Sequence, residues 1–139
     1  MKLFLDTSVL LAGCNSASGA STAICNMARQ QGWDLLASPW VLEEVTRNLR
    51  KFSAAATITW TGLRQRITVV DDVVSLDRAL VFPVSKDRPV LITALAWADV
   101  LLTLDSADFI GLLGSSCYGL PILLPADFLI RERAAGRLR

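Results

Sequence analysis

Short runs of mostly apolar residues alternate along the chain with longer stretches in which apolar residues recur at helical spacing. The short runs cover residues 2–5, 34–38, 67–70, 100–104 and 119–124. They lack a regular alternation of apolar and polar positions, which is typical of strands buried on both faces of a sheet. We therefore expect about five strands.

The longer stretches predict helices, over residues 18–31, 39–52, 54–66 and 89–98. Gly32 provides a stop for the first helix, because glycine readily adopts the left-handed conformation that ends helices. Ser38 and Pro39 suit the N-cap and the first turn of the second helix. Strands and helices thus alternate along the chain.

This alternation predicts a parallel sheet with right-handed crossovers and helices on both faces. We expect an α/β protein of three layers, α/β/α, with a central, mostly parallel sheet of about five strands. The chain has 139 residues, 53% of them hydrophobic, and no linker or internal repeat, so residues 1–139 are predicted to form a single domain. Ligands of such folds bind beyond the carboxyl ends of the strands.

The amino-acid composition narrows the chemistry. The chain contains no histidine, which excludes Ser/His/Asp and Cys/His nucleophile systems, histidine general bases and histidine-bound zinc. Cys14, Cys25 and Cys117 include no C-x-x-C pair, which favours reduced core thiols over a zinc site or a disulfide framework. A net charge of +1 leaves the kind of partner open.

The apolar pattern predicts neither a membrane span nor an exported chain. The longest apolar stretch, residues 89–104, is interrupted by Asp99 and is shorter than the roughly 18 to 20 residues that a span needs. The amino-terminal residues lack the charged segment, long apolar segment and cleavage site of a signal peptide. We expect a cytoplasmic protein that does not act at a membrane.

Carboxylates recur where strands end and helices begin. Asp6 directly follows the first predicted strand and Asp105 the fourth, so both are expected at the carboxyl edge of the sheet. Asp108 lies three residues after Asp105. Asp87 lies two residues before Pro89, where the start of a helix faces the same edge. The pattern predicts a cluster of acids at this edge.

The second predicted helix supplies a further acid, and helical geometry decides between two neighbours. With about 100° of rotation per residue, Val41, Val45 and Leu49 form one apolar stripe. Glu44 lies roughly 100° from the centre of that stripe, and Glu43 lies roughly 155° away. We therefore expect Glu44 to border the protein body and Glu43 to face water.

A cation is expected among these acids, because like charges repel each other and raise each other's pKa values. Oxygen ligands without histidine or thiolate favour hard divalent ions, above all Mg²⁺ and Mn²⁺. Such ions leave positions open for phosphate oxygens and lower the pKa of a bound water, which suits phosphoryl chemistry. Ser8 and Thr103, each two residues from an aspartate, are candidates to orient the carboxylates or to hold metal-bound water.

Four segments of the chain form a familiar pattern: FLDTSVLLAG, LEEVTRNL, KDRPVLITAL and ADVLLTLDSADF. In this order, and over most of the chain, they resemble PIN-domain ribonucleases, especially the toxin-type, VapC-like members of toxin-antitoxin pairs. By position, the resemblance assigns catalytic roles to Asp6, Glu44, Asp87 and Asp105. It assigns metal binding to Asp6, Asp87, Asp105 and Asp108.

The resemblance implies a PIN-like fold and Mg²⁺- or Mn²⁺-dependent endonuclease activity on single-stranded or structured RNA. It also implies a homodimer, and a small antitoxin protein that blocks the acidic site. Ser8 is a departure, because the family often has asparagine there, although serine can still donate a hydrogen bond. Residues 52–82 carry no motif that aligns with the family, so the RNA target stays open.

Other functions compete with this one. A PIN-like module that binds RNA or protein without cutting would have lost one or more of the acids, whereas a housekeeping RNA-processing nuclease would keep them. An aspartic protease needs glycine, and a haloacid-dehalogenase-type phosphatase needs aspartate, at the position of Ser8. Both of these enzyme classes are therefore disfavoured.

Each acid also has a purely structural interpretation. Asp6 could cap the helix that follows it, and Asp87 could interact with a helix dipole. Glu44 could be an ordinary charge at a helix edge, and Asp105 and Asp108 could be turn residues. Five acids placed at strand ends and helix starts that face one way favour a common site over five separate structural roles.

Two further sets of residues are assigned to structure. Asp99 is expected to support the turn from a helix to a strand. The four tryptophans are expected to pack in the core, and only Trp60 is a candidate for stacking on a base, because it lies in the segment without a family motif.

Overall fold

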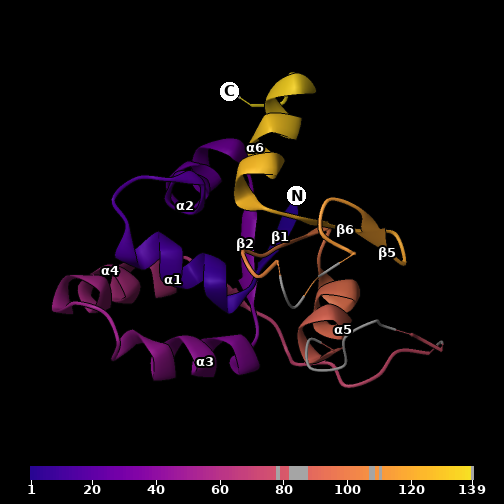
Figure 1. Cartoon of the computed structure of the whole chain (residues 1–139), viewed down its shortest axis with the longest axis horizontal. Helices are drawn as coiled ribbons and strands as arrows, with labels where there is room; N and C mark the ends of the chain where they lie inside the picture. Colours follow the sequence, from indigo (N-terminus) through magenta and orange to yellow (C-terminus); the bar gives the residue numbers. More distant parts are fainter. Residues whose placement is uncertain (78, 82–87, 107–108, 110, 139) are drawn as a thin grey trace.

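One sheet of six strands runs through the described part of the chain (Figure 1). The computed structural model describes residues 1–77, 79–81, 88–106, 109 and 111–138. The strands are β1 (Lys2–Leu5), β2 (Asp34–Ala37), β3 (Thr68–Val69), β4 (Val100–Leu102), β5 (Ser116–Cys117) and β6 (Leu120–Leu123). Their order is β3-β2-β1-β4-β6-β5, and the pairs are parallel except that of β5 with β6.

Helices flank this sheet. They are α1 (Thr7–Asn15), α2 (Ala20–Gln31), α3 (Pro39–Leu49), α4 (Ala54–Arg64), α5 (Arg88–Trp97) and α6 (Pro125–Ala134). In Figure 1, α1, α2 and α4 lie on one side of β1 and β2, and α5 lies on the other. The prediction of a three-layer α/β/α fold with a mostly parallel sheet is confirmed. None of the helices that the structure describes is long and apolar enough to cross a membrane.

Burial explains why β1 and β4 form the middle of the sheet. Leu3, Phe4 and Leu5 have no exposed surface, and β4 is buried along its whole length. Elements that cover both faces of these strands leave no position for a polar side chain. Leu5 pairs with Leu102, so β1 and β4 end at the same level. This register decides which residues meet at the carboxyl edge.

The predicted elements are present with small shifts at their ends. The five predicted strands are β1, β2, β3, β4 and β6, and the four predicted helices are α2, α3, α4 and α5. Gly32 ends α2 in the left-handed conformation with φ at 72°, and Ser38 occupies the N-cap of α3. Gly32 therefore ends its helix as expected, whereas Ser38 occupies the expected N-cap position without a side-chain capping hydrogen bond.

Three elements lie outside the predicted ranges, α1, β5 and α6, and of these α1 was considered only as the helix that Asp6 could cap. β5 is two residues long and pairs with β6 through a turn in which Gly119 has a φ of 85°, so it is too short for a periodic pattern. In α6, Phe128 packs edge-on against Trp33 with 5.1 Å between ring centroids. One turn later the buried residue is Glu132, paired with Arg137 at 2.7 Å. This buried glutamate interrupts the apolar stripe from which a helix is predicted.

Candidate active site

The carboxyl ends of β1 and β4 bring Asp6 and Asp105 to one edge of the sheet. The backbone N–H of Asp6 donates to the carbonyl of Leu102 at 3.0 Å, which ties the end of β1 to the end of β4. The hydroxyl of Thr103 donates to Oδ2 of Asp6 at 2.8 Å and accepts the N–H of Asp105 at 3.0 Å. One buried hydroxyl therefore joins the two aspartates that the sequence placed at this edge.

Ser8 holds the same carboxylate from the first turn of α1. Its hydroxyl donates to Oδ2 of Asp6 at 3.3 Å and accepts the N–H of Leu104 at 3.0 Å. Ser8 and Thr103 thus converge on one oxygen of Asp6 from two different elements. Hydrogen bonds from two directions fix the orientation of a carboxylate, which is the arrangement expected around a ligand to a metal ion.

Glu44 borders the same edge from α3. It is half-buried, and its Oε2 lies 3.4 Å from the hydroxyl of Thr7, a long hydrogen bond from the first residue of α1. Glu43 is exposed. The predicted orientation of these neighbours is confirmed, because α3 buries Val41 and Val45 and thereby turns Glu44 toward the protein body.

The pKa of Asp6 is raised above its ordinary value of 3.8, chiefly because burial disfavours the charged carboxylate. The hydrogen bond from Thr103 opposes this shift, the negative charge of Glu44 adds to it, and the hydrogen bond from Ser8 makes a smaller opposing contribution. A carboxylate that is held in place yet resists ionisation near a second carboxylate gains stability from a bound cation.

The donor chemistry of this edge fits a divalent cation. The described groups are carboxylates and hydroxyls, and the free thiols of Cys14, Cys25 and Cys117 are buried elsewhere in the core. Among the described residues, no group of three or more acids or cysteines is close enough to form a complete metal site. The predicted ligands Asp87 and Asp108 lie outside the described residues. Asp6, Glu44 and Asp105 are therefore the part of the predicted set that the structure describes.

Two structural interpretations can be compared with the structure. Asp6 occupies the N-cap position of α1, yet its side chain makes no capping hydrogen bond. Asp99 is structural, as predicted, and its carboxylate accepts the N–H of Lys2 at 2.7 Å at the start of β1. Asp99 thus supports the amino end of the sheet and lies apart from the acidic edge.

The exposure of the four tryptophans differs from the prediction. Trp60 is only 8% exposed and packs in the core, so its candidacy for base stacking is wrong. Trp33 is buried to the same degree. Trp40 and Trp97 are 46% and 41% exposed, which the expectation of core packing missed. The position of Trp40 at the start of α3, one turn before Glu44, was a signal in the sequence that this tryptophan could be exposed.

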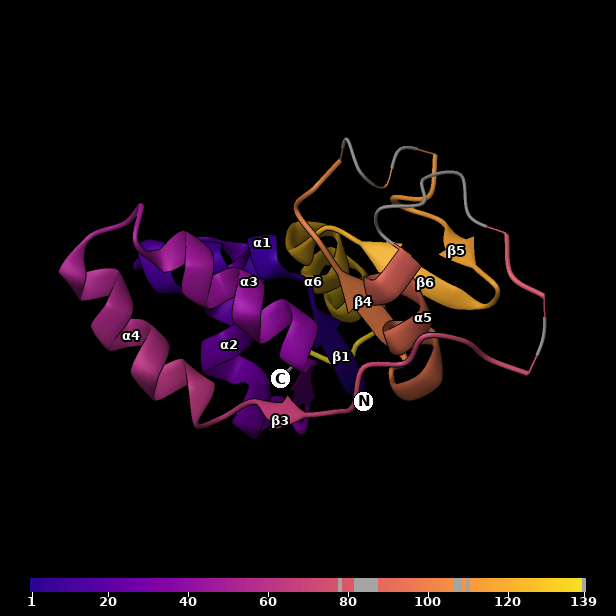
Figure 2. The ribbon, with the colours of Figure 1, turned by 90° about the horizontal axis from the view of Figure 1, so that it is seen from below.

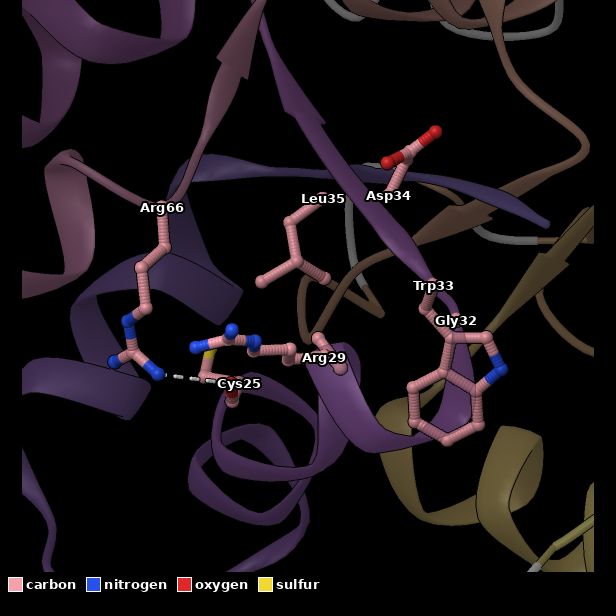
Figure 3. Close-up of a pocket in the computed structure, with 8 residues that line it drawn as sticks. Cys25, Arg29, Gly32, Trp33, Asp34, Leu35 and Arg66 are labelled. Carbon is pink, nitrogen blue, oxygen red and sulfur yellow. Dashed lines mark hydrogen bonds between the residues drawn. The ribbon is translucent and has the colours of Figure 1, made fainter.

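A separate cavity of about 450 Å³ lies beside the amino end of β2 (Figure 3). Its lining includes Cys25, Arg29, Trp33, Asp34 and Arg66. The guanidinium of Arg66 donates to the carbonyl of Cys25 at 3.2 Å, and Figure 3 shows Asp34 pointing away from both arginines. With one carboxylate and two guanidinium groups, this cavity does not suit a metal ion, and the acidic edge stays the candidate active site.

These observations define the class of protein. It has an α/β fold with a mostly parallel sheet, and acidic side chains follow the central strands. Residues 2–107 match a family model described as PIN domain. The match spans most of the chain, and the chain belongs to the PIN domain family. The resemblance inferred from the sequence is confirmed at this level.

Two solved structures are similar in fold. The structure of VapBC2 from Rickettsia felis bound to a DNA fragment from their promoter contains a chain with a TM-score of 0.61 and 14% identity, covering 88% of this chain and 97% of that one. PAE2754 from Pyrobaculum aerophilum has a TM-score of 0.62 and 18% identity, covering 96% of this chain and 90% of its own. A comparison with curated proteins finds no match. At these identities the likeness establishes the fold.

Proposed function

We propose that this protein is an endoribonuclease that hydrolyses RNA phosphodiester bonds at the acidic edge with Mg²⁺ or Mn²⁺. The observation that carries the proposal is the Asp6 carboxylate, which two hydroxyls hold in place where β1 and β4 end, and whose pKa is raised. Proteins of the PIN domain family are generally nucleases, which supports the same conclusion.

In this proposal Asp6 and Asp105 would hold the cation from adjacent strands, and Asp87 and Asp108 would complete its ligands. When bound, a divalent cation stabilises charge on the phosphate and lowers the pKa of a coordinated water. Glu44 would add a further negative charge that favours binding of the cation.

Thr103 and Ser8 act through Asp6. Their hydrogen bonds fix one carboxylate oxygen, so the carboxylate does not have to reorganise when a cation binds. Thr103 also accepts the Asp105 N–H, which couples the positions of the two aspartates. We assign both hydroxyl residues a positioning role.

We further propose that the protein is the toxin of a toxin-antitoxin pair, a homodimer that acts on RNA in the cytoplasm and is neutralised by a small antitoxin protein covering the acidic edge. The fold likeness to a chain of the VapBC2 complex supports an antitoxin partner. The proposal treats residues 1–139 as the single nuclease domain.

Cleavage of a mixed single-stranded RNA tests this function. Purified protein is assayed with Mg²⁺, Mn²⁺ or EDTA beside Asp105→Asn and the control Asp34→Asn, which changes an exposed acid at the opposite edge. We expect metal-dependent cutting that only Asp105→Asn abolishes. Folded wild-type protein that binds RNA but cuts none with any metal would instead make it a binding module.

A further inference from the structure

A second pocket, of about 310 Å³, lies between the start of α3 and the start of α5. Its lining includes Trp40, Asp72, Val73, Arg88, Pro89 and Ile92. On α3, Trp40 precedes Glu44 by four residues, about 6 Å along the helix axis. α3 begins directly after β2, whose carboxyl end lies beside that of β1, and α5 packs against α3. The pocket therefore lies at the same, carboxyl edge of the sheet as Asp6.

The outer wall of this pocket is held in place by hydrogen bonds. The chain that follows β3 runs past the start of α3 and across α5 (Figure 2). Asp72 accepts the N–H of Trp40 at 3.1 Å, and the N–H of Val73 donates to the hydroxyl of Thr93 at 3.0 Å. The indole N–H of Trp97 donates to the carbonyl of Asp71 at 3.0 Å. Contacts with both helices thus preform the pocket.

The pocket suits the flat, uncharged ring of a nucleobase. Trp40 is 46% exposed at its mouth, and an exposed indole next to a nucleic-acid site is a stacking surface for an unpaired base. Val73, Pro89 and Ile92 add apolar contacts. The lining carries one negative charge, on Asp72, and one positive charge, on Arg88, so it has no net charge to attract a phosphate group.

We propose that this pocket binds one unpaired nucleobase of the RNA strand whose phosphate lies at the acidic edge, with the base stacked on Trp40. The inference rests on the proposed function. Both carboxylate oxygens of Asp72 accept the Trp40 N–H, at 3.3 and 3.1 Å, and each oxygen has a further lone pair, with which a carboxylate accepts a hydrogen bond from the exocyclic amino group of cytosine. Uracil carries no such group, so the pocket prefers cytosine to uracil. Bases within a duplex are stacked and cannot enter, which makes single-stranded RNA the substrate class.

The test measures binding without cleavage, using labelled decamers of cytidine or uridine and the Asp105→Asn protein in Mg²⁺. Replacing Trp40 by leucine keeps apolar bulk and removes the aromatic face, and should weaken cytidine-decamer binding about 5- to 100-fold. Trp40→Phe should retain most of the affinity. The matched control is Ile130→Ala, an exposed apolar residue on α6, which should bind like the parent protein.

Base preference provides a second readout. The parent protein should bind the cytidine decamer about fivefold or more tightly than the uridine decamer. Asp72→Asn keeps an oxygen acceptor for the Trp40 N–H but lacks the negative charge, and should narrow this preference. A uridine decamer bound as tightly as the cytidine decamer by the parent protein would overturn the assignment of Asp72.

The molecular mass of the Trp40→Leu protein in solution shows whether the pocket is instead a contact between two copies of the chain. Three results would each overturn the proposal. The first is equal binding of the cytidine decamer by Trp40→Leu and the parent protein, and the second is no binding of either decamer. The third is a Trp40→Leu protein that changes from dimer to monomer. Failure of the nuclease function gives a different result. In that case wild-type protein cuts no RNA, while Trp40-dependent binding of the cytidine decamer persists.

Discussion

Replacing Thr103 by valine tests how the acidic edge is held. The side chain has no exposed surface, and its hydroxyl donates to Asp6 at 2.8 Å. Valine has nearly the same shape but no hydroxyl, so the change removes this hydrogen bond together with the one that Thr103 accepts from the N–H of Asp105. A hydrogen bond to a charged group contributes about 1.5 to 3 kcal/mol. At about 2.1 cal/mol/K per residue over 139 residues, this corresponds to a fall in Tm of about 5 to 10 °C.

Thermal unfolding in EDTA at pH 8 and pH 4 measures this effect. The hydrogen bond favours ionised Asp6, so its loss should cost more stability at pH 8 than at pH 4, because the raised pKa of Asp6 leaves a larger fraction of the carboxyl protonated at the lower pH. Thr103→Ser, which keeps the hydroxyl, is the control. The Asp6→Asn background should reduce the difference between the two pH values, as a double-mutant cycle requires. An equal loss of Tm at both pH values would refute the assignment of this bond to the ionised carboxylate.

Three further predictions concern charge and burial. Asp6→Asn should abolish cleavage and raise the metal-free unfolding free energy. A raised folded-state pKa makes wild type lose stability as the pH rises from about 4, so this gain should grow with pH, and a gain independent of pH would contradict it. Glu44→Gln should reduce the cleavage rate far more than Glu43→Gln, and equal rates would assign Glu44 to structure. Cys14 and Cys25, whose pKa values burial raises to about 11, should react with a thiol reagent at pH 8 only after unfolding, and rapid native-state labelling would contradict their burial.

The sequence predicted the position of the acidic edge because strand ends are local features. An apolar run that stops at Asp6 or just before Asp105 marks the end of a strand, and parallel pairing places such ends together. The choice of Glu44 over Glu43 required only helical periodicity. These inferences use short-range patterns that the packed structure retains.

Other features depend on tertiary structure. The bond from Thr103 to Asp6 joins residues 97 positions apart and requires the register that pairs Leu5 with Leu102. The exposure of Trp40 depends on the segment around Asp72, which carries no periodic pattern. Sequence reasoning assigned tryptophan to the core on average behaviour, and such an average cannot identify the tryptophans that stay exposed, here Trp40 and Trp97.

The most direct test of the central claim is the location of Mn²⁺ by anomalous diffraction from crystals of the wild-type protein soaked in the ion. We expect a peak within about 2.0 to 2.6 Å of a carboxylate oxygen of Asp6, and its loss in crystals of Asp6→Asn. The opposite result is Mn²⁺ that binds elsewhere and leaves the Asp6 carboxylate free of metal, in crystals of a protein that cleaves RNA with Mn²⁺. That result would contradict the assignment of the acidic edge as the active site.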